Sequence, residues 1–220
     1  MNKDLLECFK EAKSPKPELP KGKSKNPNND IFKKIEEGLC SEDKLMAFAK
    51  KGSSGIKRHL VKAPNITDEI ISVLSTDFFD FVRESIIEKA TGDVLVRLAK
   101  DKSSKVKFSL LQRNNLPSSV LRMLYEDVDS KIRSAVASHH NTDLDILAML
   151  SYEFPDVVAN NKNADSFILD NIINFVFDDK NNSKGFSKSF IGRAVFNNKN
   201  VSPETVSKLE SKTIFKKLTK

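Results

Sequence analysis

The chain has 220 residues, of which 39% are hydrophobic and 30% charged, and its formal net charge is +7. This suits one folded domain with a modest core, and two cysteines are too few for a disulfide framework or a four-thiolate metal site. There is no run of about 18 apolar residues, and the first residues lack the apolar stretch of a secretory signal. The sequence therefore predicts a cytoplasmic protein without a membrane-spanning helix.

The charge is unevenly distributed along the chain. Residues 143–182 contain 2 Lys/Arg and 8 Asp/Glu, whereas residues 183–220 contain 9 Lys/Arg and 2 Asp/Glu. A uniformly basic nucleic-acid binder is not expected to contain so acidic a segment. The C-terminal end nevertheless remains a candidate basic patch.

The first residues are predicted to form an arm. Apolar residues recur at helical spacing in residues 3–13, namely Leu5, Leu6, Phe9 and Ala12. This pattern indicates a short amphipathic helix. Residues 14–29 are rich in Lys, Pro and Asn and have little apolar surface to bury. The sequence thus predicts a flexible Lys/Pro-rich arm with this helix at 1–29, and a repeat domain at 30–220.

A helix is predicted directly after the arm. Its apolar residues Ile31, Phe32 and Ile35 lie at helical spacing. Asp30 is suited to cap its N-terminus, and Gly38 is suited to end it.

The central part of the chain repeats itself. Five segments share a Leu-x-x-Leu-like pattern and begin at Leu45, Ile71, Leu95, Leu121 and Leu147. These starts are spaced 26, 24, 26 and 26 residues apart. Eleven residues after each of the first four comes a second apolar start, at Ile56, Val82, Val106 and Ile132. Such a period predicts stacked pairs of helices, each burying its apolar face against the next pair.

The repeat becomes irregular towards the C-terminus. Residues 154–165 predict a shortened second helix in the fifth unit, and residues 178–185 a polar, exposed loop. The pattern returns at residues 194–206, and the last helices are expected to close the stack.

The recurrent Leu-x-x-Leu-x-x-Asp, Val-Arg and Asn-x-(Pro/Thr) pattern resembles HEAT-like α-solenoids, especially the leucine-rich-repeat-variant type. The resemblance covers roughly residues 41–210 and implies an all-α, right-handed α-solenoid of about six HEAT-like helical repeats. Proteins of this kind are mostly interaction scaffolds. One branch consists of DNA glycosylases that use tryptophans, and this chain has no Trp. Some variants carry a cysteine-ligated iron–sulfur cluster, which the two distant cysteines here do not match.

Acid–base pairs six residues apart recur across the turn inside the repeats, namely Asp77 with Arg83, Asp101 with Lys107, and Asp127 with Arg133. The favoured interpretation is a structural ladder, in which the acid caps a helix and the base bonds to the neighbouring unit's acid. The other interpretation is a basic stripe on the concave face that binds phosphates or acidic side chains. The first repeat has no acid at this place, so residues 50–58 are the better candidate for a free basic patch. The stripe comprises Lys57, Arg58, Arg83, Lys107 and Arg133.

Three aromatic residues follow Asp77, where other repeats have Lys/Ser or Val/Asp. Phe78, Phe79 and Phe81 are more than one turn needs for core burial. Phe78 and Phe79 are therefore candidates for an exposed aromatic contact with a partner.

No catalytic signature is present. Phosphate-binding Gly-rich, Gly-x-Ser-x-Gly and His-Glu-x-x-His motifs are all missing from the sequence. His139 and His140 are adjacent, so on a helix they point in different directions and do not chelate one metal. We therefore expect no enzyme activity, no cofactor and no metal.

The sequence favours a noncatalytic scaffold or adaptor that binds a protein partner on the concave face of the solenoid. An acidic or extended segment of that partner is the favoured target. The predicted contact residues are Lys57, Arg58, Arg83, Lys107, Arg133, Phe78 and Phe79. The alternative is a nucleic-acid-binding protein that contacts phosphates through the same stripe and the basic C-terminus.

Overall fold

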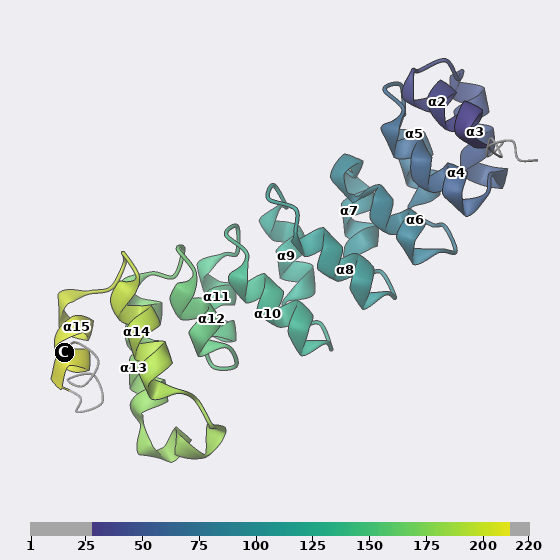
Figure 1. Cartoon of the computed structure of the whole chain (residues 1–220). Helices are drawn as coiled ribbons and strands as arrows, with labels where there is room; N and C mark the ends of the chain where they lie inside the picture. Colours follow the sequence, from purple (N-terminus) through teal and green to yellow (C-terminus); the bar gives the residue numbers. More distant parts are fainter. Residues whose placement is uncertain (1–27, 212–220) are drawn as a thin grey trace, which may run out of the picture.

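The computed structural model describes residues 28–211, and this part of the chain is all-helical. It contains fourteen α-helices, three short 3₁₀ helices and no strand (Figure 1). The predicted all-α class is confirmed. The predicted helix at residues 3–13 and the apolar residues after position 211 lie outside the described residues.

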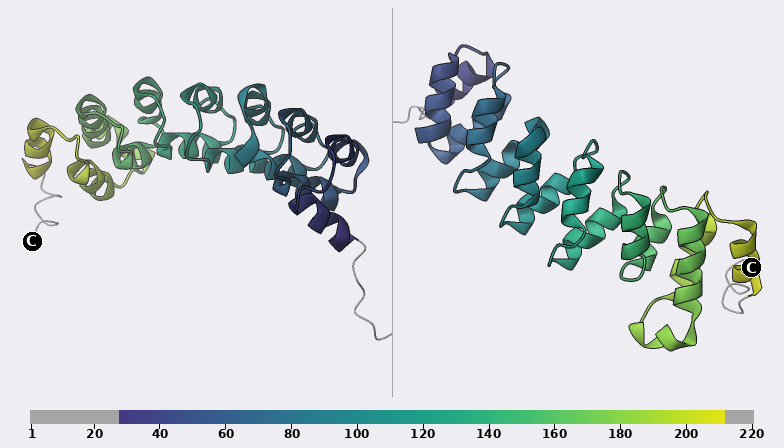
Figure 2. Two further views of the ribbon diagram at one scale, coloured as in Figure 1. Left: turned by 90° about the horizontal axis from the view of Figure 1, so that it is seen from above. Right: turned by 180° about the vertical axis from the view of Figure 1, so that it is seen from behind.

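The helices alternate between two layers that follow a shallow arc (Figure 2). The outer layer, on the convex side, contains α3 (Glu42–Lys51), α5 (Asp68–Leu74), α7 (Gly92–Ala99), α9 (Ser118–Leu124), α11 (Leu144–Leu150), α13 (Ser166–Phe177) and α15 (Pro203–Ser211). The inner layer, on the concave side, contains α2 (Asn28–Glu36), α4 (Ser54–His59), α6 (Asp80–Ser85), α8 (Ser104–Leu111), α10 (Ser130–Ser138), α12 (Pro155–Asn160) and α14 (Lys188–Asn197). The 3₁₀ helices are η2 (Leu60–Lys62), η3 (Ile87–Lys89) and η4 (Asp179–Lys184).

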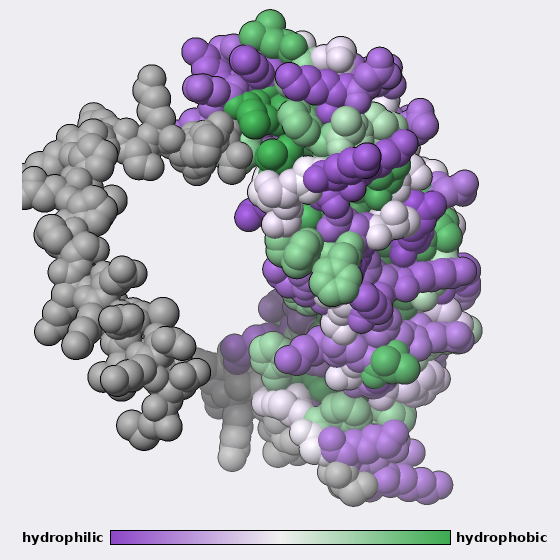
Figure 3. All heavy atoms as spheres, turned by 90° about the vertical axis from the view of Figure 1, so that its right-hand side faces the viewer, coloured by the Kyte–Doolittle hydropathy of each residue, from purple (hydrophilic) through white to green (hydrophobic). Residues whose placement is uncertain are grey.

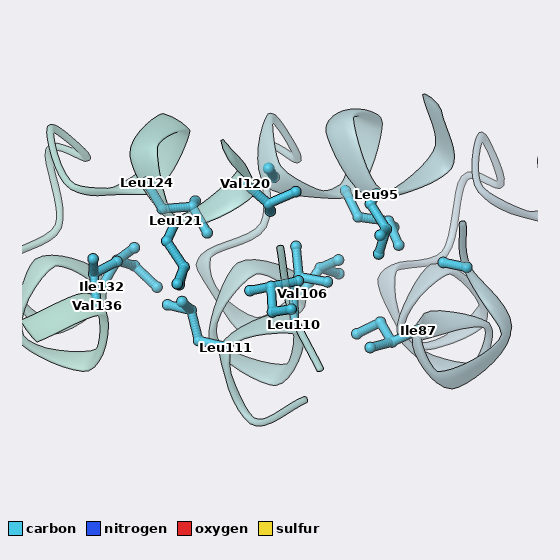
Figure 4. Close-up of a cluster of buried hydrophobic side chains, with 14 of the residues drawn as sticks. Ile87, Leu95, Val106, Leu110, Leu111, Val120, Leu121, Leu124, Ile132 and Val136 are labelled. Atoms are coloured by element: carbon cyan, nitrogen blue, oxygen red, sulfur yellow. The ribbon is translucent and has the colours of Figure 1, made fainter. Parts of the chain in front are cut away.

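The core lies between the two layers and continues along the array. In Figure 4, Leu95 and Leu121 of the outer layer point towards Val106 and Ile132 of the inner layer. Residues three or four apart share one face of a helix, so the Leu-x-x-Leu pattern gives each short helix one buried face. Burial of each such side chain contributes about 1.5–3 kcal/mol. Val82 is buried in the same continuous core, as the shared register of the repeats predicted.

Helix α2 packs against the first repeat. It begins at Asn28, so Asp30 lies in its first turn and the prediction that Asp30 is the N-cap was wrong. Gly38 ends the helix as predicted, with a φ of 70°. Ile35 is fully buried, and seen from this end of the molecule the hydrophobic side chains form small patches between hydrophilic ones (Figure 3). A polar end of this kind suits a terminal unit of a stack.

The C-terminal units are irregular in the predicted places. Helix α12 has 6 residues, so it is shorter than α8 and α10, as predicted, but no shorter than α4 and α6. Residues 178–185 were predicted to form a loop, but most of them form η4, whose end is marked by Gly185 with a φ of 71°. The prediction that this segment is exposed was correct for Asp178, Lys180 and Lys184.

Candidate partner-binding surface

The turns inside successive helix pairs line up along one edge of the array (Figure 1), where predicted basic residues meet acids. Lys57 Nζ donates to Asp77 Oδ2 at 2.6 Å. Arg83 makes a two-point contact with Asp101, through Nε at 2.6 Å and the terminal Nη2 at 2.7 Å. Each base therefore reaches the acid of the next unit along the chain.

The same pattern continues through the next two units. Lys107 forms an ion pair with Asp127. Arg133 contacts Glu153, with Nε 3.0 Å from Oε2. Glu153 stands where the earlier units have Asp, so this longer carboxylate extends the series by one step. We name these four pairs the ion-pair ladder.

The acids of the ladder also order the turns that hold them. Oδ1 of Asp101 accepts the backbone N–H of Ser103 at 2.8 Å. Burial acts to raise the pKa of Asp101, but the hydrogen bonds from Arg83 and Ser103 and the Arg83 charge outweigh it, so the pKa lies below its ordinary value. The acids bond to the turn rather than to the first N–H groups of the helix, so the capping part of the ladder prediction was wrong.

The basic residues of the predicted stripe thus fall into two groups. Arg83, Lys107 and Arg133 lie in the ion-pair ladder, as the ladder interpretation predicted. Lys57 was expected in a free basic patch at residues 50–58, and for this residue the prediction was wrong, because Lys57 is paired with Asp77. Arg58 is exposed, and within residues 28–211 it has no ion-pair partner. Whether any of the five contacts a partner remains a prediction.

Phe78 and Phe79 are exposed at the tip of the turn between α5 and α6, at 81% and 44%. Their rings meet edge to face with centroids 5.2 Å apart, and Lys102 Nζ lies 5.8 Å from the centre of the Phe78 ring. Phe81 is half-buried against the core. The predicted exposure of the pair is confirmed, and its contact with a partner stays a prediction.

A second ladder, which was not predicted from the sequence, runs along the edge formed by the loops between units. Equivalent residues near the ends of the inner helices bond to backbone carbonyls of the preceding unit, namely Arg113, His139, Asn161 and Asn198. Asn161 Nδ2, for example, donates to the carbonyls of Ala137 at 2.8 Å and His139 at 3.1 Å. The asparagine of the recurrent Asn-x-(Pro/Thr) pattern lies two residues after this position, and Asn65, which belongs to that pattern, donates to the Cys40 carbonyl at 2.9 Å.

His139 takes part in this second ladder as a neutral side chain. Its Nδ1 accepts the N–H of Asn141 at 3.1 Å, so Nε2 carries the proton and donates to the Arg113 carbonyl at 3.0 Å. Burial lowers the pKa of His139, and the nearby His140 lowers it further, against the opposing effect of the Arg113 carbonyl. The ring therefore helps to hold two units together.

A hollow with a volume of about 830 Å³ lies on the inner layer, over α8, α10 and α12. We call it the α10 groove. Small side chains of α10 form its floor, including Ser134, Ala135 and Ser138. Phe108 of α8 lines it on one side and Val157 of α12 on the other. None of these residues was among the predicted contacts, because three helices from different repeats must come together to form the groove.

Comparison of the chain with family models, with curated proteins and with solved structures gave no match. Within residues 28–211, no group of His, Cys, Asp and Glu side chains is arranged to hold a metal ion. In the same part of the chain, no helix combines the length and apolar character needed to cross a membrane.

Proposed function

We propose that this chain is a right-handed α-solenoid of HEAT-like repeats that serves as a noncatalytic scaffold and binds a protein partner on its inner layer. Six consecutive helix pairs, from α3/α4 to α13/α14, support the solenoid assignment. Stacks of this kind present long concave surfaces suited to binding.

The α10 groove is the observation that carries this proposal. Phe108 is 46% exposed on its rim, although nothing in the fold requires a large apolar side chain at the surface there. An apolar rim around a hollow of this size is typical of a site that buries part of a partner.

Protein binding is favoured over nucleic-acid binding by the state of the basic residues. Four of the five residues of the predicted stripe are neutralised by carboxylates in the ion-pair ladder. Breaking these pairs to bind phosphate would leave acids facing the phosphate, which is unfavourable.

Site-specific photo-crosslinking tests the proposal. p-Benzoylphenylalanine is placed at position 108 in the groove or at position 96 on the outer layer, where Val96 is 38% exposed. In the cells that make the protein, we expect position 108 to crosslink to one protein and position 96 not to do so. The captured protein, once purified, should bind the unmodified chain, and the Ser134→Arg variant should weaken that binding by about tenfold or more.

Two results would contradict the proposal. One is equal crosslinking from both positions, which would mean that the inner layer has no special role. The other is a crosslinked product that nuclease removes, which would favour the nucleic-acid alternative.

A further inference from the structure

We infer that the α10 groove binds an extended peptide segment that carries a short run of apolar residues next to a carboxylate. This inference rests on the proposed function, and it names the chemistry of the partner. It follows from the floor, the rims and the charge of the groove, which are independent features.

The floor of the groove presents hydroxyl groups in a regular row. Ser130, Ser134 and Ser138 are four residues apart on α10, and all three line the groove. Their hydroxyls make no hydrogen bond to another residue within 28–211, whereas the asparagines of the loop edge are bonded to backbone carbonyls. The groove therefore has donors and acceptors available for a ligand.

The spacing of these hydroxyls matches an extended peptide. Residues four apart on a helix rise about 6 Å along its axis. Alternate residues of an extended chain, whose backbone N–H and C=O groups point the same way, are about 6.6 Å apart. An extended segment lying along α10 can thus present alternate backbone groups to successive serines.

The two rims suit the side chains of such a segment. Successive side chains of an extended chain point to opposite sides, so with its backbone edge on the floor they would meet Phe108 on one side and Phe154 and Val157 on the other. Both rims are apolar, so consecutive apolar residues are favoured. Helix α10 has 9 residues and is about 13 Å long, which corresponds to about four extended residues.

The charge of the groove favours a peptide with an acidic residue next to its apolar run. No Asp or Glu is among the described residues that line the groove, and Lys131 lies near the N-terminal end of α10. Lys131 is exposed, and its ammonium group has no ion-pair partner in residues 28–211. A carboxylate on the peptide, beyond the apolar run, complements this charge.

The test uses a phage-displayed library of random twelve-residue peptides, selected on the full-length chain. We expect enriched peptides to contain about four consecutive apolar residues flanked by Asp or Glu. The Ser134→Leu variant should bind synthetic versions of these peptides with an affinity lower by about tenfold or more, because the leucine fills the floor of the groove and a hydroxyl is lost. The matched control is Ser119→Leu, an exposed serine on α9 in the outer layer, which should leave affinity unchanged.

Two further variants test the geometry and the charge. N-methylation of the alternate backbone amides that face α10 should remove binding, whereas N-methylation of the intervening amides should leave it largely unchanged. A helical ligand would be weakened by either set, because each set removes N–H groups that the hydrogen bonds of the helix need. The Lys131→Glu variant should bind the acidic peptides more weakly. Replacing the acidic residue of the peptide with Lys should restore the affinity for that variant.

The inference is overturned if no peptide is enriched, if enriched peptides show apolar residues three and four apart, or if Ser134→Leu binds them normally. The proposed function would survive any of these results if position 108 still crosslinks to a protein partner. Loss of that crosslink would instead remove the proposed function itself.

Discussion

The side chains of Arg83 and Asp101 are each only 6% exposed, and each supplies the opposite charge that the other needs. Arg83 also donates to the backbone carbonyls of Asp77 at 2.7 Å and Phe78 at 3.2 Å. A buried guanidinium needs several acceptors, because its donors are costly to leave unpaired. The pair therefore joins two units and at the same time orders the turn between α5 and α6.

We predict that Asp101→Asn lowers the free energy of unfolding by about 3–5 kcal/mol, since it leaves the buried Arg83 charge without its counterion. Urea denaturation followed by circular dichroism measures this. The control is Asp145→Asn, which breaks the exposed contact with Arg122 and should have a much smaller effect because water screens that pair. Equal effects of the two substitutions would show that burial does not govern the ladder.

At the level of the single element, the end of a helix determines how closely it can pack against its neighbour, and α2 is an example. Leu39 N–H donates to the Lys34 carbonyl at 2.9 Å, which closes the helix through the left-handed Gly38. A Cβ on Gly38 would lie 2.9 Å from Cγ of Pro64, in the loop after the first helix pair. This glycine therefore permits both the turn and the close approach of α2 to the first unit.

Two glycine-to-alanine substitutions separate these effects. Gly38→Ala should destabilise the protein by more than about 1 kcal/mol, because its φ is positive and its Cβ meets Pro64. Gly55→Ala in α4 should stabilise it by about 0.5–1 kcal/mol, since a Cβ there meets nothing within 4 Å and alanine favours helix. Thermal melts of both variants give the sign of each effect, and stabilisation by Gly38→Ala would refute the role assigned to this turn.

Across the whole molecule, stability depends on contacts between neighbouring units. The helices contact others that are near in the sequence, and the ladders join each unit only to an adjacent one. In such an array a defect is expected to act mainly on nearby units.

Ile172→Ala tests this expectation, because Ile172 is buried in α13 and its truncation should cost about 2–5 kcal/mol locally. Hydrogen exchange measured by mass spectrometry should show faster exchange in α11 to α15 and unchanged exchange in α3 to α6. A uniform increase over all helices would indicate a single cooperative unit instead.

Much of this architecture was predictable from local patterns. The regular spacing of the apolar starts at Leu45, Ile71 and Leu95 is visible in the sequence alone, because each short helix must bury one face wherever it packs. The presence of an acid–base ladder was predictable for the same reason, because acids and bases equivalent to Asp101 and Arg83 recur at fixed positions relative to those helices. The beginning of α2 and the 3₁₀ helix η4 were not, because helix ends depend on local contacts that periodicity does not report.

The amino-acid sequence by itself determined the helical class, the repeat register and the recurrence of charged pairs, all of which follow from short-range periodicity. Only the tertiary structure decided which cations remain unpaired and where the groove lies. Within residues 28–211, Arg58 and Lys131 have no ion-pair partner, because no carboxylate of a neighbouring unit reaches them. Phe108, Ser134 and Val157 meet only once α8, α10 and α12 are stacked. Such contacts depend on the distance between units, which no single repeat encodes.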